Sequence, residues 1–382
     1  MRLSFPINAR LALFYCAFFI YAGAYVAYFP AYLAWRGLGA AEIAWVIALP
    51  AFVRIVAPTA WGALADRTGW QRGIVVLSCA ANVACFALLP HAAGFGAIAW
   101  LIAVTSALAA AAMPLVETIT LGALAGRAGA QLGHYGPIRL WGSIGFIAAV
   151  LGGGAWLDWR SVEALPAALA LCSGLCVAAA LFLPTGIRHP AQTAAPLVVS
   201  RVAQAVLAAG FCMSAAHGAL YAFFTLHLQR EGYSGSAIGL FWTLGVLAEI
   251  VVFLYLPALF RRFALSALLV ASFACAVLRF LAIGWLAALP AVLILAQLLH
   301  AATFGSFHAA SVAAVHRVFP PQAQGRGQTL FSSICYGAGG AAGALLAGWA
   351  WEAGGPGFAF SLSSVLSLAG LLFAYTLKRE GL

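Results

Sequence analysis

The stretch Trp61-Gly62-Ala63-Leu64-Ala65-Asp66-Arg67-Thr68-Gly69-Trp70-Gln71-Arg72 carries one acid, two arginines and two glycines between long apolar runs. The apolar run at residues 42–63 cannot end in such charges inside lipid, so they belong at a membrane surface, and the arginines favour the cytoplasmic one. We expect a tight, charged loop. Its glycines would let two helix ends approach each other closely.

The composition predicts an integral membrane protein. Of the 382 residues, 65% are hydrophobic and 7% are charged, whereas a soluble domain has about 25% charged residues. The apolar runs recur at about the 20 residues that cross a bilayer, and their backbone groups must bond within each run, as in helices. We therefore expect an all-α membrane protein with twelve transmembrane helices. They are expected at residues 11–34, 42–63, 73–90, 96–122, 138–157, 164–184, 203–228, 236–259, 264–283, 289–314, 328–350 and 357–377.

The net charge of +10 is explained by membrane topology. The arginines are spread over short loops, which does not favour a nucleic-acid partner. Most of them fall in segments predicted to be cytoplasmic, whereas the outer loops hold only Arg36, Arg160 and Arg230. Both termini are therefore expected on the cytoplasmic side. The eight cysteines lie in apolar segments without metal-type spacing, so we expect no metal or cofactor. We also expect the protein to be a monomer.

An internal repeat divides the chain into two halves. At an offset of 195 residues (231 minus 36), Arg36-Gly37-Leu38 aligns with Glu231-Gly232-Tyr233, and Arg54 aligns with Glu249. The segment 185–202 separates the halves as a proline-containing linker. We therefore expect one six-helix bundle at residues 1–184 and a second at 203–382.

The pattern Gly62-x-x-x-Asp66-Arg67-x-Gly69-x-x-Arg72 resembles the signature loop between the second and third helices of the major facilitator superfamily. This resemblance implies two six-helix bundles that are related by a parallel repeat and bind substrate near the bilayer midplane. It also implies alternating access, with a cytoplasmic gate at Gly62, Asp66, Arg67 and Arg72.

Two acids, Glu117 and Glu249, fall inside predicted spans. An intramembrane charge costs about 2.5 to 3.5 kcal/mol, so such a residue is a functional candidate and should face a partner or water. A carboxyl group that alternates between an apolar environment and an arginine would load and release a proton. Glu249 is the candidate carrier, with Arg54, Arg139 or Arg279 as its partner. The alternative is a static ion pair between helices.

The sequences Pro114-Leu-Val-Glu117 and Arg139-Leu-Trp-Gly142-Ser143 resemble the pair that lactose permease and its relatives use to bind substrate. On this resemblance Glu117 is a substrate acid and Arg139 a substrate arginine. Phe146 stands where the permease has the tryptophan on which its sugar stacks, which argues against a sugar. Alternatively, Arg139 is one more arginine of the cytoplasmic surface.

Arg279 and His300 resemble the coupling arginine and histidine of the same permease, but Thr303 replaces its proton-coupling glutamate. His217 and His308 are further candidates for hydrogen bonding or protonation. A metal site is not expected, because the eight residues from His300 to His308 turn a regular helix about 80° away from one face.

Aromatic residues form one stripe along the first predicted helix. Four phenol hydroxyls in line are unfavourable against lipid, so this face should meet protein or water. The stripe holds Phe18, Tyr21, Tyr25, Tyr28 and Tyr32, and His217, Tyr221 and Phe224 form a matching face in the seventh helix. By resemblance both faces line a substrate cavity, with Tyr25, Tyr28, His217 and Tyr221 in contact with substrate. The alternative is aromatic packing between helices.

Over nearly its whole length the chain resembles the superfamily branch that contains the 3-phenylpropionate permease and is related to nucleoside and oligosaccharide proton symporters. The stretches Tyr135–Ser143, Gly232–Gly239 and Leu299–Phe304 carry the resemblance. It implies a symporter, not an enzyme, that imports a small aromatic carboxylate with protons across a bacterial inner membrane. The alternatives are a sugar or nucleoside symporter, an efflux antiporter, a membrane enzyme and a sensor. The fifth predicted helix has Gly152-Gly153-Gly154 and lacks the Gly-Pro motif of antiporters.

Overall fold

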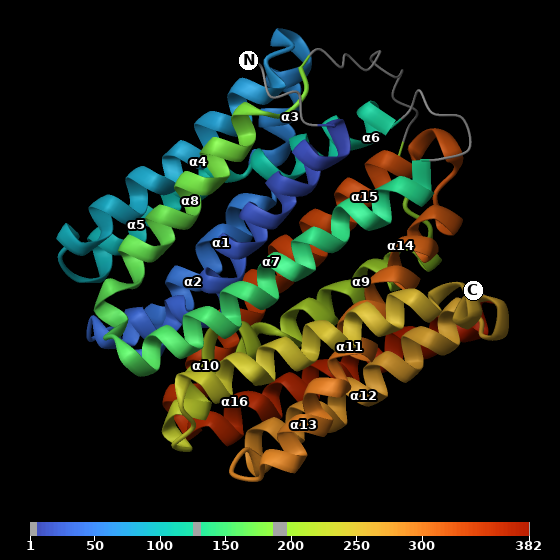
Figure 1. Cartoon of the computed structure of the whole chain (residues 1–382). Helices are drawn as coiled ribbons and strands as arrows, with labels where there is room; N and C mark the ends of the chain where they lie inside the picture. Colours follow the sequence, from blue (N-terminus) through green and yellow to red (C-terminus); the bar gives the residue numbers. More distant parts are fainter. Residues whose placement is uncertain (1–5, 125–130, 186–196, 382) are drawn as a thin grey trace. The chain divides into compact units, whose positions relative to one another are not determined.

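The computed structural model describes residues 6–124, 131–185 and 197–381 (Figure 1). Every regular element within these ranges is a helix. Among the described residues, ten helical stretches are long and apolar enough to cross a membrane, or eleven if the bent pair Ala40–Arg54 and Ala57–Thr68 is one span. The predicted all-helical, multi-pass class is thus confirmed, whereas the number twelve and the side of the termini stay predictions.

The described elements follow one another along the chain. They are α1 (Ile7–Trp35), α2 (Ala40–Arg54), α3 (Ala57–Thr68), α4 (Gln71–Leu88), η1 (Leu89–His91), α5 (Gly94–Ala109), α6 (Ala112–Leu124), α7 (Gln131–Trp159), η2 (Val162–Ala164), α8 (Leu165–Leu181), α9 (Arg201–Ala216), α10 (Gly218–Arg230), α11 (Gly235–Arg262), α12 (Leu265–Leu286), α13 (Pro290–Leu298), η3 (Ala301–Ser306), α14 (Phe307–Val318), η4 (Pro321–Ala323), α15 (Gln324–Ser332), η5 (Ser333–Gly339) and α16 (Gly340–Arg379). Within α16, Gly355 has a non-helical backbone (φ 74°, ψ −166°). Gly355 lies in the gap between the predicted spans 328–350 and 357–377.

The chain divides into two compact units. Unit 1 comprises Met1–Gly37 and Val56–Ala191, and unit 2 comprises Leu38–Ile55 and Gln192–Leu382. Helix α2 therefore belongs to unit 2, although the sequence placed it in the first half. The division into 1–184 and 203–382 stays a prediction, and most of the predicted linker 185–202 lies outside the described residues.

The predicted second span is interrupted between α2 and α3. Pro58, near the start of α3, has no backbone N–H to donate to the Arg54 carbonyl four residues earlier, so a regular helix cannot continue through this point. One of the boundaries between the two units, between Ile55 and Val56, falls at this interruption.

Close helix crossings hold each unit together. In unit 1, α1 packs along α7, and a Cβ atom on Gly145 would lie 2.3 Å from the Cys16 carbonyl oxygen. In unit 2, α16 packs against α9, α10, α12 and α2, and a Cβ atom on Gly343 would lie 2.2 Å from the Ala215 carbonyl oxygen. Only glycine fits at these two crossings.

The internal repeat is visible in the backbone. Gly37 follows α1 with φ 83°, and Gly232 follows α10 with φ 84°. The next helices begin at Ala40 and Gly235, again 195 residues apart (235 minus 40). The two predicted repeats therefore share the same left-handed glycine turn and the same helix start.

Candidate functional site

Two π-helical segments mark the polar region of unit 2. They are η3 (Ala301–Ser306) and η5 (Ser333–Gly339). Such turns are rare in helices and frequently occur at functional sites. His300 directly precedes η3, Thr303 and Phe304 lie within it, and Tyr336 lies within η5. The turn η3 therefore coincides with residues that the sequence singled out, whereas Tyr336 in η5 was not among them.

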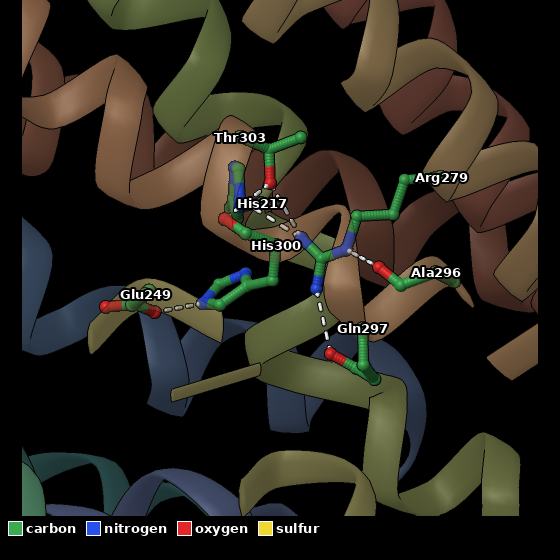
Figure 2. Close-up of polar contacts among 7 residues, drawn as sticks. All are labelled: His217, Glu249, Arg279, Ala296, Gln297, His300 and Thr303. Atoms are coloured by element: carbon green, nitrogen blue, oxygen red, sulfur yellow. Dashed lines mark hydrogen bonds and ion pairs between the residues drawn. The ribbon is translucent and has the colours of Figure 1, made fainter. Parts of the chain in front are cut away.

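Arg279 of α12 is fully buried, and neutral groups hold its guanidinium (Figure 2). Nε donates to the Ala296 carbonyl at 2.9 Å, Nη1 donates to the Thr303 hydroxyl at 3.1 Å, and Nη2 donates to the Gln297 side-chain oxygen at 3.2 Å. Thr303, which replaces the permease's glutamate, thus acts as a hydrogen-bond acceptor for the arginine.

His217 lies between α9 and α10 and contacts the same guanidinium. Its Nδ1 lies 2.8 Å from the Met213 carbonyl oxygen. A carbonyl only accepts hydrogen bonds, so Nδ1 carries a hydrogen and Nε2 of the neutral ring is an acceptor. Arg279 Nη1 lies 3.5 Å from this Nε2. His217 therefore orients Arg279.

Glu249 and His300 form a close pair in the same region (Figure 2). Glu249 Oε1 lies 2.6 Å from His300 Nε2, and the two side chains are only 15% and 10% exposed. At this distance a proton must lie between the two atoms, because two lone pairs would repel each other. The sequence pointed to an arginine as the partner of Glu249, whereas the structure shows a pair with histidine; the arginine partner stays a prediction.

Two buried polar atoms beside this pair have no hydrogen-bond partner among the described residues. They are His300 Nδ1 and Gln297 Nε2. A Cβ atom on Gly245 would lie 3.2 Å both from Gln297 Oε1 and from His300 Cδ2, so glycine leaves room beside both side chains. A buried polar group without a partner costs about 1 to 3 kcal/mol, which a polar ligand would offset.

The rings of His300, Phe304 and His308 form one stack. His300 and Phe304 have centroids 5.3 Å apart and an interplanar angle of 18°, and Phe304 and His308 have centroids 6.4 Å apart and an angle of 13°. The predicted 80° offset between the histidines was wrong, because it assumed 3.6 residues per turn and η3 is π-helical. Phe304 separates the two rings. In the described part of the chain, no cluster of three or more His, Cys, Asp or Glu residues could hold a metal ion.

In unit 1, Arg139 of α7 lies over aromatic rings. Its guanidinium carbon is 4.2 Å from the Phe19 ring centroid and 5.7 Å from that of Tyr15. A Cβ atom on Gly142 would lie 2.7 Å from Arg139 Nη1, so this glycine makes space for the guanidinium. Glu117 of α6 is within electrostatic reach of Arg139. The two predicted substrate residues are therefore neighbours.

The tyrosines of α1 do not share one environment. Tyr28 donates to the Val150 carbonyl, and the Tyr32 hydroxyl accepts from Arg36 at 2.7 Å. Tyr25 stacks on Phe29 with centroids 4.6 Å apart. Tyr28 and Tyr32 are buried within unit 1, so at least these two contribute to helix packing. A substrate role for Tyr25 and Tyr28 stays a prediction.

Phe146 and Tyr221 occupy different settings. The Phe146 backbone passes Gly23 of α1 closely, since a Cβ atom there would lie 3.0 Å from the Phe146 carbonyl oxygen. Tyr221 of α10 lies beside His217, with ring centroids 6.0 Å apart. Tyr221 thus adjoins the Arg279 region, whereas the Phe146 backbone packs against α1; a substrate role for Phe146 stays a prediction.

The charged stretch at Trp61–Arg72 is mostly helical, and the expected loop is shorter than predicted. Helix α3 runs through Asp66 and Arg67 to Thr68, and only Gly69 and Trp70 precede α4. Gly69 ends the helix in the left-handed conformation (φ 67°) and donates to the Ala65 carbonyl at 2.8 Å. The expected close approach at Gly62 was wrong, because a Cβ atom there would meet nothing within 4 Å.

Sequence reasoning missed Gln297 and Tyr336. Gln297 is the one amide within the apolar stretch 291–299. A lone polar side chain in such a run needs a hydrogen-bond partner, so the sequence could have indicated Gln297 as a site residue. Tyr336 hydrogen-bonds His308 at 2.7 Å, but no residue pattern predicted the π-helical turn that carries it.

Comparison with known proteins assigns the chain to a family. Residues 8–362 match the family model described as MFS_1 like family. The chain belongs to this family. It is accordingly a multi-pass membrane transporter of the major facilitator type and not an enzyme.

The relatives of the chain are described as transporters of different solutes. It is 34% identical over 185 residues to a protein of Escherichia coli (strain K12) described as a probable 3-phenylpropionic acid transporter, covering 47% of this chain and 48% of that protein. This match thus spans about half of the relative's length. The chain is 27% identical over 381 residues to a maltose permease of Geobacillus stearothermophilus, covering 96% and 94% of the two chains. Its fold is similar to the crystal structure of the nucleoside transporter NupG (D323A mutant), with a TM-score of 0.85, 15% identity, and 99% and 100% coverage.

Proposed function

We propose that the chain is a proton-coupled symporter that imports a small aromatic carboxylate of the phenylpropionate type by alternating access. The pair Glu249–His300, buried in a membrane-spanning region beside Arg279, is the observation that carries this proposal. The 34% identity to the 3-phenylpropionic acid transporter supports the substrate class.

The pair offers two protonation states. With one proton between the two atoms, His300 is neutral and its Nδ1 accepts hydrogen bonds. A second proton makes His300 a cation, and Nδ1 then donates. Because Nδ1 has no partner among the described residues, this change alters what the site offers to a bound solute. Proton loading and substrate recognition are in this way linked through one ring.

The remaining features of the proposal come from the sequence. Substrate contacts include Glu117 and Arg139 in unit 1 and His217 and Tyr221 in unit 2. The exposed charges Asp66, Arg67 and Arg72 act as the cytoplasmic gate. The chain is a monomer in a bacterial inner membrane and has both termini in the cytoplasm. Fusing a cytoplasm-only fluorescent protein to either terminus tests this topology: both fusions should fluoresce, and a dark, fully expressed fusion would contradict it.

Transport into proteoliposomes tests the proposed coupling. Under an inside-alkaline pH gradient, the wild-type protein should accumulate labelled 3-phenylpropionate, whereas Glu249→Gln should exchange it without accumulation. Glu163→Gln is the matched control, because Glu163 is an exposed acid in the turn before α8. Uphill accumulation by Glu249→Gln at the wild-type level would refute Glu249 as the proton carrier.

A sugar symporter is the second candidate, since the maltose permease aligns over nearly the whole chain. A panel of labelled 3-phenylpropionate, maltose and a nucleoside separates the two candidates. Accumulation of maltose alone would replace the proposed substrate class. Uptake driven only by an inside-acid gradient would instead identify an efflux antiporter.

A further inference from the structure

Arg54, at the end of α2, is a cation that no other described side chain neutralises. Across residues 6–124, 131–185 and 197–381 it forms neither a hydrogen bond nor an ion pair, and it is exposed. By contrast, Arg279 donates to three acceptors, and Arg139 lies over Phe19. An arginine within a membrane span costs about 2.5 to 3.5 kcal/mol and should have a partner or water.

Arg54 and the exposed aromatic residues of α2 lie on opposite sides of the helix. Trp45 and Phe52 are 48% and 40% exposed and stack on each other with centroids 6.3 Å apart. Arg54 follows Trp45 by nine residues (54 minus 45), which is about 180° around a helix. The Arg54 side chain therefore leaves α2 on the side opposite these exposed aromatic residues.

The π-helical segment η5 fixes the end of α2. The Ser333 hydroxyl donates to the Ile55 carbonyl at 3.2 Å. A Cβ atom on Gly337 would lie 2.7 Å from Ile55 Cγ1 and 3.4 Å from the Ala51 carbonyl oxygen. These contacts, formed within unit 2, hold Ile55, the residue next to Arg54, against η5, which also carries Tyr336.

Two phenol groups of unit 2 are close enough to Arg54 to interact with its charge. Tyr221 and Tyr336 are both within electrostatic reach of Arg54. Tyr336 shares a hydrogen bond with Nδ1 of His308 at 2.7 Å. When Nδ1 donates in that bond, the phenol hydrogen of Tyr336 is available to a ligand. One arginine and two phenols together offer several donors for an anion with a single charge.

We infer that Arg54, with Tyr221 and Tyr336, binds the carboxylate group of the transported solute. The inference rests on the proposed function and names the residues that recognise the anionic end of the substrate. A guanidinium matches a carboxylate because two parallel N–H groups can reach its two oxygens. A single arginine balances one negative charge, which favours a monocarboxylate over a phosphate dianion.

This position also explains how substrate and proton would influence each other. Tyr221 is within electrostatic reach of both Arg54 and Glu249. An anion bound at Arg54 therefore lies near the Glu249–His300 pair and favours the proton-loaded state of that pair. By thermodynamic reciprocity, the loaded proton favours binding of the anion by the same factor.

Binding to the purified, full-length protein tests the inference. We expect the wild type to bind 3-phenylpropionate more tightly than the neutral 3-phenylpropanamide, measured by titration calorimetry. Arg54→Gln should weaken carboxylate binding about tenfold to a hundredfold and amide binding much less, because glutamine can still donate a hydrogen bond to a neutral amide but has no charge to balance the carboxylate. Arg54→Lys should retain part of the preference.

Arg230→Gln is the matched control. Arg230 is also in unit 2, but its guanidinium lies over Trp351 at 4.7 Å from the ring centroid, so its loss should not change carboxylate affinity. Tyr336→Phe provides a milder change in case Arg54→Gln fails to fold, and should lower carboxylate affinity severalfold. Its control is Tyr255→Phe, at an exposed position of α11.

The outcomes separate this inference from the proposed function. If Arg54→Gln and Tyr336→Phe both bind the carboxylate as the wild type does, the site assignment is wrong while the symport proposal stands. If the wild type binds no aromatic carboxylate, the proposed substrate class falls and the inference falls with it. Displacement of 3-phenylpropionate by equal concentrations of chloride or inorganic phosphate would overturn recognition of a carboxylate.

Discussion

Glu249 Oε1 and His300 Nε2 lie 2.6 Å apart, on helices of the same unit. The π-helical turn that follows His300 stacks its ring on Phe304. The acid and the base therefore lie within one compact unit, so a proton can pass between them without movement of one half of the transporter against the other.

Replacing His300 with glutamine should separate exchange from accumulation. The amide of His300→Gln can still donate to Glu249, but it cannot take up a second proton. We expect labelled 3-phenylpropionate to exchange in counterflow, while accumulation under an inside-alkaline gradient is lost. His91→Gln, at an exposed histidine of η1, serves as the control. Full accumulation by His300→Gln would exclude this ring from the proton path.

Arg279→Lys should destabilise unit 2. A lysine ammonium cannot reproduce the three-way arrangement of the guanidinium with Ala296, Gln297 and Thr303. Each buried acceptor left without a donor costs about 1 to 3 kcal/mol. Thermal unfolding in detergent should show a lower midpoint than for Arg261→Lys, at an exposed residue at the end of α11. Equal midpoints would show that the bonds to Arg279 contribute little to stability.

Gly145→Ala should separate α1 from α7 and lower the stability of unit 1. The added Cβ atom would lie 2.3 Å from the Cys16 carbonyl oxygen, whereas at Gly152 of the same helix it would meet nothing within 4 Å. Overpacking of this kind costs about 1 to 3 kcal/mol. Gly152→Ala should be neutral or stabilising, because alanine favours helix by about 1 kcal/mol. Unfolding midpoints of the two variants provide the comparison, and identical values would contradict the close crossing.

Tyr28→Phe distinguishes packing from substrate binding on α1. Loss of the hydrogen bond to the Val150 carbonyl should lower stability by about 0.5 to 1.5 kcal/mol and leave the affinity for 3-phenylpropionate unchanged. Unfolding and calorimetric titration of the same preparation measure both quantities. Weaker binding with an unchanged midpoint would instead support the substrate role that the sequence assigned to Tyr28.

The sequence predicted features that depend on composition or on repeated local patterns. The all-helical class follows from hydropathy, and the offset of 195 residues aligned Gly37 with Gly232, where the structure has matching turns. The isolated charge at Glu249 was recognisable because an acid in an apolar run is unfavourable without a partner. Hydropathy, the repeat and the isolated acid can all be recognised from short stretches of sequence, without knowing the path of the backbone.

The remaining features depend on the backbone path. The histidine partner of Glu249 and the stack of His300 on Phe304 involve a π-helical turn that hydropathy does not reveal. The helical state of Asp66 was missed because charge alone was interpreted as a loop, whereas the helix ends only at the left-handed Gly69. The exposure of Arg54 likewise depends on how α2 is seated on η5.

The π-helical turn η3 lies between His300 and His308, so the position of one histidine can change during evolution without moving the other. Losing one residue from this turn would restore regular α-helical spacing and rotate the chain that follows by about 100°. His308 would then leave Phe304 and Tyr336, whereas His300, which precedes the turn, would keep Glu249. Deletion of a single codon could thus remove the contact of His308 with Tyr336, and so change anion binding, in a descendant protein that keeps the Glu249–His300 pair.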